Sequence, residues 1–198
     1  MSSKALITKF ASKDGVDARV VERDYVLAHI VALISSNDAE KRLIFKGGSS
    51  LRLLHFDDYR YSADLDYSVI KGSEAEAMEV VRSALAKGQR PAAIKQLSLT
   101  GASDRIVYVG PFGAERTIKL DLADDELVIN TETRSLLKRW PDIPEVTITA
   151  YTTLEITAEK LRCVPTAHSM PRLLGPWPLT RRRRPNSRGR ALLPQSPS

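Results

Sequence analysis

An abrupt change in composition near Leu161 limits how much of this chain can fold into a packed domain. Seven of the eleven prolines lie at or after Pro165, and from Leu161 to Ser198 the chain has eight arginines and no acidic residue. Proline lacks the amide hydrogen that helices and sheet ladders use, and so polar a segment buries too little apolar surface to offset its ordering entropy. We therefore predict an Arg/Pro-rich, disordered tail over residues 165–198.

Net charge divides the chain at the same place. The segment from Leu161 carries +8, whereas the preceding 160 residues hold 22 basic and 24 acidic side chains, a net charge of −2. The overall charge of +6 is therefore no sign that the folded part binds nucleic acid. Cys163 is the single cysteine, and no apolar run approaches the roughly 18 residues of a membrane span. We expect a cytoplasmic protein without a membrane segment.

Residue periodicity predicts both helices and strands in the folded part. Apolar residues that recur every three or four positions, together with capping residues, indicate helices at 17–35, 49–55, 73–87 and 153–164. Short apolar runs and strict alternation indicate strands at 42–46, 64–69, 94–99, 105–109 and 116–122. This mixture predicts an α/β protein.

Two adjacent glycines follow the first of these strands, in the string Lys46-Gly47-Gly48-Ser49-Ser50. The glycines allow a tight turn, and Ser49 or Ser50 is expected to cap the next helix. A glycine turn at a helix start exposes backbone amide groups and the positive end of the helix dipole, which attract phosphates. A lone turn of this composition is, however, usually only structural.

Strict alternation places Asp64 and Asp66 on one face of their strand. At roughly 3.3 Å per residue the two carboxylates lie about 7 Å apart and can hold a divalent cation between them. Asp121, on a later alternating strand, could supply a third oxygen for a two-metal site of phosphoryl transfer. Taken singly, the aspartates also fit a solvated sheet face, and Lys119 beside Asp121 fits a surface ion pair.

The motifs follow one another in the order Lys-Gly-Gly-Ser-Ser-Leu, Arg-Tyr-Ser-x-Asp-Leu-Asp-Tyr, Lys-x-Asp and Ala-Glu-Lys-Leu. This order resembles the abortive-infection nucleotidyltransferase toxins of the AbiEii and MenT type, within the polymerase-β-like nucleotidyltransferase superfamily. The resemblance includes the string Glu22-Arg23-Asp24-Tyr25 and covers about residues 20–164. It implies a mixed, mainly antiparallel sheet flanked by helices, with a truncated C-terminal helical part.

The resemblance also implies an active site. Asp64 and Asp66 would bind magnesium, and Asp121 or Lys119 would complete the site. Lys160 would act with these aspartates by reaching the nucleotide phosphates. Without the resemblance to the family, the simpler interpretation of Lys160 is an exposed charged residue on a helix. The implied nucleotide-binding residues are Lys46, Gly47, Gly48, Ser49, Ser50, Ser62 and Lys119. We hypothesise that a phosphate on Ser62, so close to the metals, would block nucleotide binding by like-charge repulsion.

The implied activity is magnesium-dependent transfer of a nucleoside monophosphate from an NTP to the 3′ end of an RNA. By family analogy this RNA is transfer RNA, so translation would stop, and a cognate antitoxin would be a partner. The implied domains are a nucleotidyltransferase core over 1–150 and the start of a helical domain over 151–164. Basic contacts to RNA are expected from Lys46, Arg52 and Arg60.

The chain departs from the family at its C-terminal end. In the family an Arg-Asp-x-x-Asp-like motif follows, yet no acidic residue occurs after Glu159. We hypothesise that the family-like chain ends near Val164 and that the tail is a frameshifted or rebuilt terminus. An arginine arm selected to bind RNA is the alternative. The competing functions are a catalytically impaired relative that binds nucleotide or antitoxin, and an RNA-binding protein that uses its tail.

Overall fold

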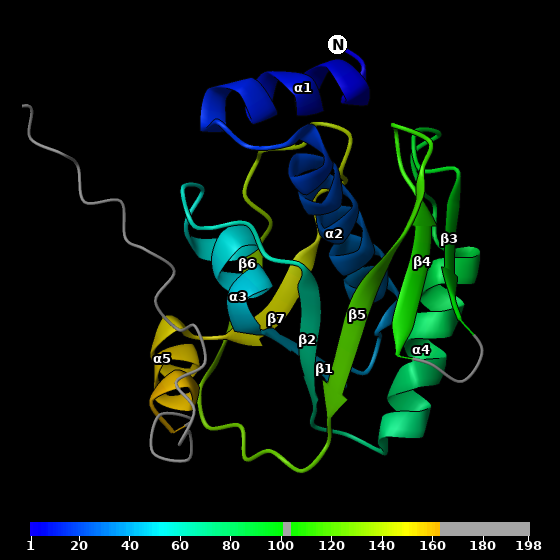
Figure 1. Ribbon diagram of the computed structural model, residues 1–198. Helices are drawn as coiled ribbons and strands as arrows, with labels where there is room; N and C mark the ends of the chain where they lie inside the picture. Colours follow the sequence, from blue (N-terminus) through cyan, green and yellow to red (C-terminus); the bar gives the residue numbers. More distant parts are fainter. Residues whose placement is uncertain (101–103, 163–198) are drawn as a thin grey trace, which may run out of the picture. The chain divides into compact units, whose positions relative to one another are not determined.

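One seven-stranded sheet organises the computed structural model, which describes residues 1–100 and 104–162 (Figure 1). The strands are β1 (Leu43–Lys46), β2 (Asp64–Val69), β3 (Gln96–Leu99), β4 (Arg105–Val109), β5 (Glu115–Ala123), β6 (Thr131–Ser135) and β7 (Thr147–Tyr151). Their order across the sheet is β3-β4-β5-β2-β1-β7-β6. The pairs β2–β5 and β1–β7 are parallel and the other neighbouring pairs are antiparallel. The expected mixed, mainly antiparallel sheet is confirmed.

Helices pack on both faces of this sheet. Helices α2 (Ala18–Asn37) and α4 (Glu74–Lys87) share the main hydrophobic core with one sheet face, and α1 (Ser3–Asp14) packs on α2. The remaining elements are helix α3 (Gly47–Ser50), the π-helical turn η1 (Leu51–His55), whose Leu53 and Leu54 join the main core, and helix α5 (Thr153–Arg162). They enclose a second, smaller cluster formed by Ile44, Leu51, Tyr151 and Ile156. Alternation along β1 sends Phe45 to the first core and Ile44 to the second.

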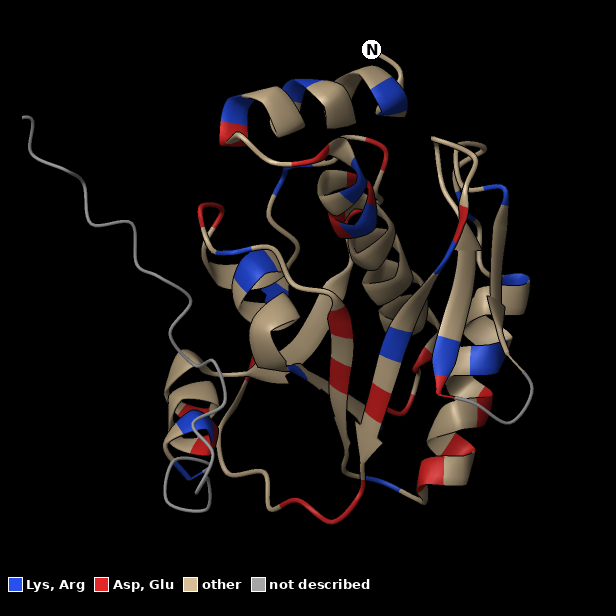
Figure 2. Ribbon diagram, viewed as in Figure 1, with Lys and Arg blue, Asp and Glu red and all other residues tan. Residues whose placement is uncertain are grey.

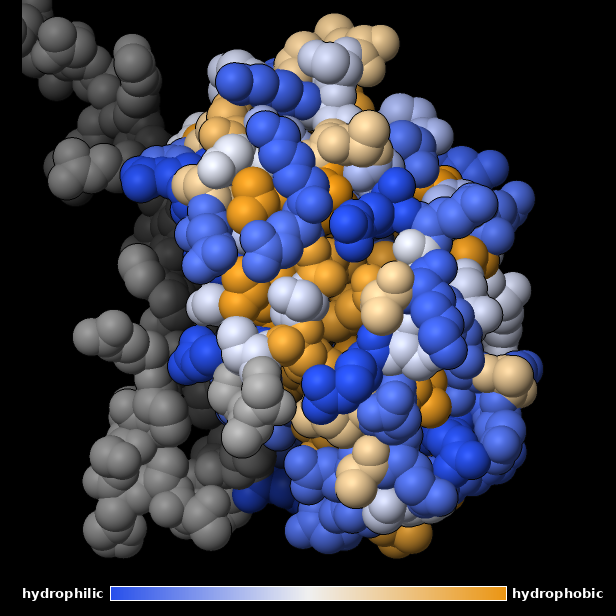
Figure 3. Space-filling view, turned by 90° about the vertical axis from the view of Figure 1, so that its right-hand side faces the viewer, coloured by the Kyte–Doolittle hydropathy of each residue, from blue (hydrophilic) through white to orange (hydrophobic). Residues whose placement is uncertain are grey.

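The second face is covered only in part. The smaller cluster draws its residues from β1, β7, η1 and α5, whereas β4 and β5 keep exposed polar residues such as Arg105, Lys119 and Asp121. Seen from the side of β3 and β4, hydrophilic residues surround a hydrophobic area in the middle of the surface (Figure 3). On this face of the sheet, β4 and β5 present exposed polar side chains beside β2.

Capping side chains determine where the predicted helices begin. The Asp17 carboxylate accepts a hydrogen bond from the Arg19 amide at 2.7 Å and caps α2. Ser73 and Glu76 form a reciprocal capping box at the start of α4. At α5 the Thr152 hydroxyl accepts from the Glu155 amide at 3.2 Å. Each such cap contributes about 1 kcal/mol, and all three helices agree with the sequence prediction.

Several elements differ from the prediction. The helix expected to begin at Ser49 begins at Gly47, and extended Lys46 precedes it without a side-chain cap. Helix α1 and the strands β6 and β7 were not anticipated. All five residues of β6 are at least partly exposed, and α1 buries only two side chains, so neither has a strong apolar period.

Residues Met1–Arg162 form one compact unit. This unit holds the predicted core over 1–150 and most of the predicted helical start over 151–164, whose separate status stays a prediction. The predicted tail over 165–198 lies outside the described residues. Among the helices of the described part, none combines the length and apolarity needed to cross a membrane.

Candidate active site

Three aspartates lie close together on the partly covered sheet face. In the parallel pair β2–β5, Asp66 is directly opposite Asp121 and Asp64 is opposite Lys119. Because directly opposed residues point to the same face, Asp64, Asp66 and Asp121 share one side of the sheet. Figure 2 shows these acidic positions side by side on β2 and β5. We call this group the aspartate face.

Crowding of like charges changes the titration of the central aspartate. Burial raises the pKa of Asp66 to about 6, and the negative charges of Asp64 and Asp121 add to the effect. Lys46 and Lys119 oppose it but do not cancel it. A carboxylate with so raised a pKa gains stability when a cation binds beside it.

The third aspartate has a partner of its own. The Lys119 ammonium lies 3.0 Å from an Asp121 carboxylate oxygen, and both side chains are about half exposed. In the part of the chain that the structure describes, no three His, Cys, Asp or Glu side chains converge on one cation position. Asp64 and Asp66 nevertheless fit a divalent cation, because their oxygens are hard ligands and the Asp66 charge lacks compensation.

The glycine turn, Gly47–Gly48, packs directly against the aspartate face. Gly47 has a φ of 75°, a left-handed conformation, and a Cβ there would overlap the Asp66 carboxylate. A Cβ on Gly48 would lie 3.3 Å from the Ser62 hydroxyl and 3.7 Å from the Arg60 guanidinium. Glycine at both positions thus lets the start of α3 approach the Asp66 carboxylate and the segment that carries Arg60 and Ser62.

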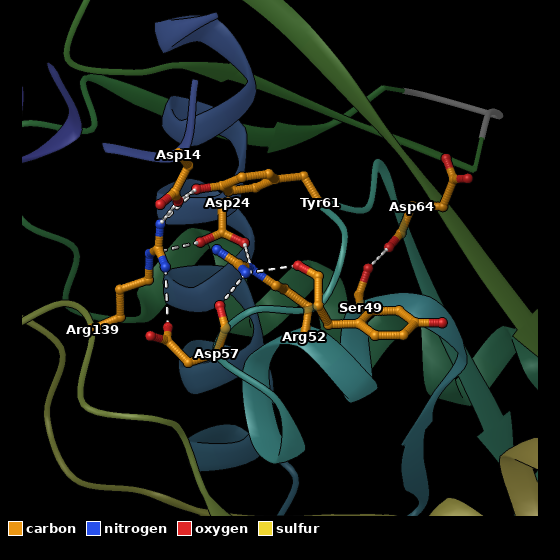
Figure 4. A network of polar contacts seen from close by, with 9 residues as sticks. Asp14, Asp24, Ser49, Arg52, Asp57, Tyr61, Asp64 and Arg139 are labelled. Carbon is orange, nitrogen blue, oxygen red and sulfur yellow. Dashed lines mark hydrogen bonds and ion pairs between the residues drawn. The ribbon is translucent and has the colours of Figure 1, made fainter. Parts of the chain in front are cut away.

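The predicted serine ligands have different surroundings. Ser49 is buried, and its hydroxyl donates a hydrogen bond to the backbone carbonyl of Asp64 (Figure 4). Ser50 is also buried, whereas Ser62 is partly exposed beside Gly48. Ser49 therefore links the glycine turn to β2, and of the three serines only Ser62 offers its hydroxyl to solvent.

Lys160 reaches the same region from α5. Its ammonium lies 3.2 Å from the Tyr59 hydroxyl and 5.7 Å from the centre of that ring. The Arg60 guanidinium also lies near this ring, 6.0 Å from its centre. Burial would raise the pKa of Tyr59, but the two cations lower it overall. The lysine that the sequence predicted is thus next to the segment that carries Arg60 and Ser62.

Lys46 is engaged by acidic side chains that the sequence did not single out. Its side chain is only 11% exposed, and its ammonium donates to Glu126 and to Glu159, the latter at 3.4 Å. The partners lie 80 and 113 residues away along the chain, so no local pattern signals them. Lys46 is therefore no exposed contact for RNA.

An ionic group centred on two arginines with buried side chains holds the loop before β2 (Figure 4). Arg139 lies 2.8 Å from Asp14 and 3.0 Å from Asp57, and Arg52 lies 3.3 Å from Asp24. We call Asp14, Asp24, Arg52, Asp57, Tyr61 and Arg139 the arginine network. Arg52 is 4% exposed, so the expectation that it contacts RNA is wrong. The periodicity of a short helix could not show which of its polar residues face inward.

Fold and site together define a class of protein: a mixed α/β protein whose strand-borne carboxylate pair lies beside a glycine turn. Residues 30–192 match the family described as nucleotidyl transferase AbiEii toxin, type IV TA system. The chain belongs to this family of toxin nucleotidyltransferases, as its motifs predicted. The matched range extends past Val164 and includes most of the predicted tail. Among curated proteins none matches the chain.

Proposed function

We propose that the protein transfers a nucleoside monophosphate from an NTP to the 3′ end of an RNA, namely transfer RNA, and so blocks translation. The observation that carries this proposal is the Asp64–Asp66 pair on β2, where burial and neighbouring like charges raise the pKa of Asp66 and the glycine turn lies directly beside it. Two like charges held this close together are favourable only when a cation binds beside them. Family membership supports the same chemistry.

Each residue of the site has a distinct task in this proposal. Asp64 and Asp66 would hold magnesium, which when bound neutralises the triphosphate and activates the attacking hydroxyl. The backbone amides of Gly47 and Gly48 bind phosphate oxygens at the start of α3. Lys160 balances the negative charge of the phosphate chain from α5. Asp121 and Lys119 lie on β5 and form the side of the site next to β4, where the RNA end would enter.

Regulation would act on the same site. We propose that an antitoxin is the protein partner, in keeping with a type IV toxin–antitoxin family, and that the toxin acts in the cytoplasm. Ser62 is partly exposed and close to Gly48, so a phosphate on its hydroxyl would occupy the space needed by the nucleotide phosphates. A Ser62→Asp variant that binds and transfers nucleotide as the wild type does would discard this regulatory role.

The direct test is incubation of the full chain with each α-labelled NTP, Mg²⁺ and total transfer RNA. Wild type should label the RNA, and Asp64→Ala should lower the rate on the order of 10³-fold, since metal binding contributes several kcal/mol to the transition state. Asp58→Ala, at an exposed aspartate of the loop before β2, is the matched control and should keep the rate. Retained NTP binding without any transfer would instead indicate a catalytically impaired relative.

A further inference from the structure

Helix α5 contacts the site on both sides of the glycine turn. On one side, Glu159 lies 3.4 Å from the ammonium of Lys46, the residue before the turn. On the other side, Lys160 lies 3.2 Å from the hydroxyl of Tyr59, in the loop before β2. Two consecutive residues of α5 therefore bind the two segments that flank the turn. The position of Lys160 therefore depends on the contact between its neighbour Glu159 and Lys46.

The Lys46 side of this contact is a preassembled polar cluster. Glu126 accepts hydrogen bonds from Lys46 and, at 2.5 Å, from the Ser68 hydroxyl. Ser68 in turn lies 2.8 Å from the Tyr151 hydroxyl, and the Tyr151 ring centre is 5.8 Å from the Lys46 ammonium. These residues come from β1, β2, β7 and the segment after β5, so Glu159 docks α5 onto a rigid part of the sheet.

The positive charge of Lys46 is compensated in this cluster. Burial alone would lower the pKa of Lys46, but Glu126 and Glu159 raise it above its ordinary value. Lys46 therefore stays charged, and its ammonium contacts two carboxylates. Only 19% of the Glu159 side chain is exposed, and a pair this buried depends much more on both partners than a solvated pair does. A lysine already paired twice is a weak ligand for a further phosphate.

We propose that Lys46 and Glu159 are positioning residues, which hold α5 so that Lys160 faces the nucleotide. This inference rests on the proposed function and changes one expectation of the sequence, because Lys46 then acts through Glu159 instead of binding the nucleotide itself. Glu126 and Ser68 are the support of the pair. The pair connects the sheet that carries the aspartates to the helix that carries the phosphate-facing lysine.

A double-mutant cycle separates positioning from a general loss of structure. In the label-transfer assay, Glu159→Gln should lower kcat about tenfold, the loss of one well-placed charged group. In a Lys160→Ala background the same change should lower the rate less than about twofold, since the lysine that it positions is gone. Glu159→Asp, which keeps the charge, should recover part of the rate. Equal losses in both backgrounds would overturn the proposal.

Hydrogen exchange tests the same contact without relying on the reaction. Amides of α5 should exchange faster in Lys46→Met and Glu159→Gln than in wild type, because the helix loses its tether. Arg162→Gln removes an exposed charge from the same helix and should leave both exchange and transfer unchanged. Unchanged α5 exchange in the first two variants would overturn the proposal. A wild-type chain that transfers no label would refute the proposed function, and with it the catalytic half of this inference, whereas the exchange rates still decide whether the pair holds α5.

Discussion

The arginine network and the aspartate face are two groups of charged side chains on either side of Ser49. Opposite charges are paired in the first group, whereas like charges are gathered in the second. In the network, Arg52 contacts a carboxylate and a backbone carbonyl oxygen, and Arg139 contacts two carboxylates. On the aspartate face, burial and the neighbouring carboxylates of Asp64 and Asp121 raise the pKa of Asp66. The chain balances charge where a loop must be held, and leaves it unbalanced where a cation and a phosphate would bind.

The largest effect on stability is expected in the network. Arg52→Met removes the guanidinium 3.3 Å from Asp24, which is 1% exposed, and leaves a buried carboxylate without its nearest cation. Breaking a buried pair in this way costs about 3–5 kcal/mol of unfolding free energy. Urea unfolding at pH 7 measures it, with Arg105→Gln on the exposed side of β4 as control. A loss below about 1 kcal/mol would show that the network does not hold the fold.

A substitution that removes charge from the aspartate face should raise the free energy of unfolding, whereas Arg52→Met lowers it. The pKa of Asp66 is raised to about 6 from an ordinary value of 3.8, so its ionised form destabilises the folded chain. This destabilisation is complete above pH 6 and disappears as the pH falls toward 4, where folded and unfolded chains both become protonated. In metal-free buffer at pH 7.5, Asp66→Asn should therefore raise the unfolding free energy by about 1–3 kcal/mol.

Unfolding measured at several pH values checks whether the loss of the Asp66 charge is what stabilises the variant. The difference between Asp66→Asn and wild type should shrink steadily from pH 6 to pH 4, as the wild-type carboxyl takes up its proton. A difference that stays constant over this range would mean that the amide acts through packing. A less stable variant at pH 7.5 would contradict the comparison between the two groups.

The smallest effect is expected at an exposed pair. Arg19 and Asp17 lie 2.6 Å apart at the start of α2, but their side chains are 64% and 46% exposed. Water screens such a pair, so Arg19→Gln should leave the unfolding free energy close to that of the wild type. Thermal unfolding beside Arg52→Met gives the contrast directly. A cost near that of Arg52→Met would show that burial is not what distinguishes the pairs.

Local patterns in the sequence predicted the parts of the fold whose signals are short-range. Alternation in β2 and β5 placed Asp64, Asp66 and Asp121 on one face, and the register between the strands confirms it. Capping residues located α2 and α4. By contrast β6, with no fully buried residue, has no alternation to detect, and it forms because β7 pairs with it. Strand pairing over a distance has no local signature.

The same limit applies to the site. The glycine turn was visible in the sequence, but its helix begins at Gly47 because close packing against Asp66 requires glycine there. Lys46 was expected at the nucleotide, whereas the fold brings Glu126 and Glu159 to its ammonium from distant segments. Arg52 was expected at the surface, and the loop before β2 buries it. Charges alone do not reveal which partners the fold supplies.

One preparation of Asp66→Asn tests the central claim, that the unbalanced charge of the aspartate face serves catalysis at the expense of stability. Its rate of label transfer to RNA and its unfolding free energy are measured beside wild type at pH 7.5. The account predicts that transfer is lost while the free energy of unfolding rises. Transfer at the wild-type rate would contradict it, as would a variant that loses both activity and stability.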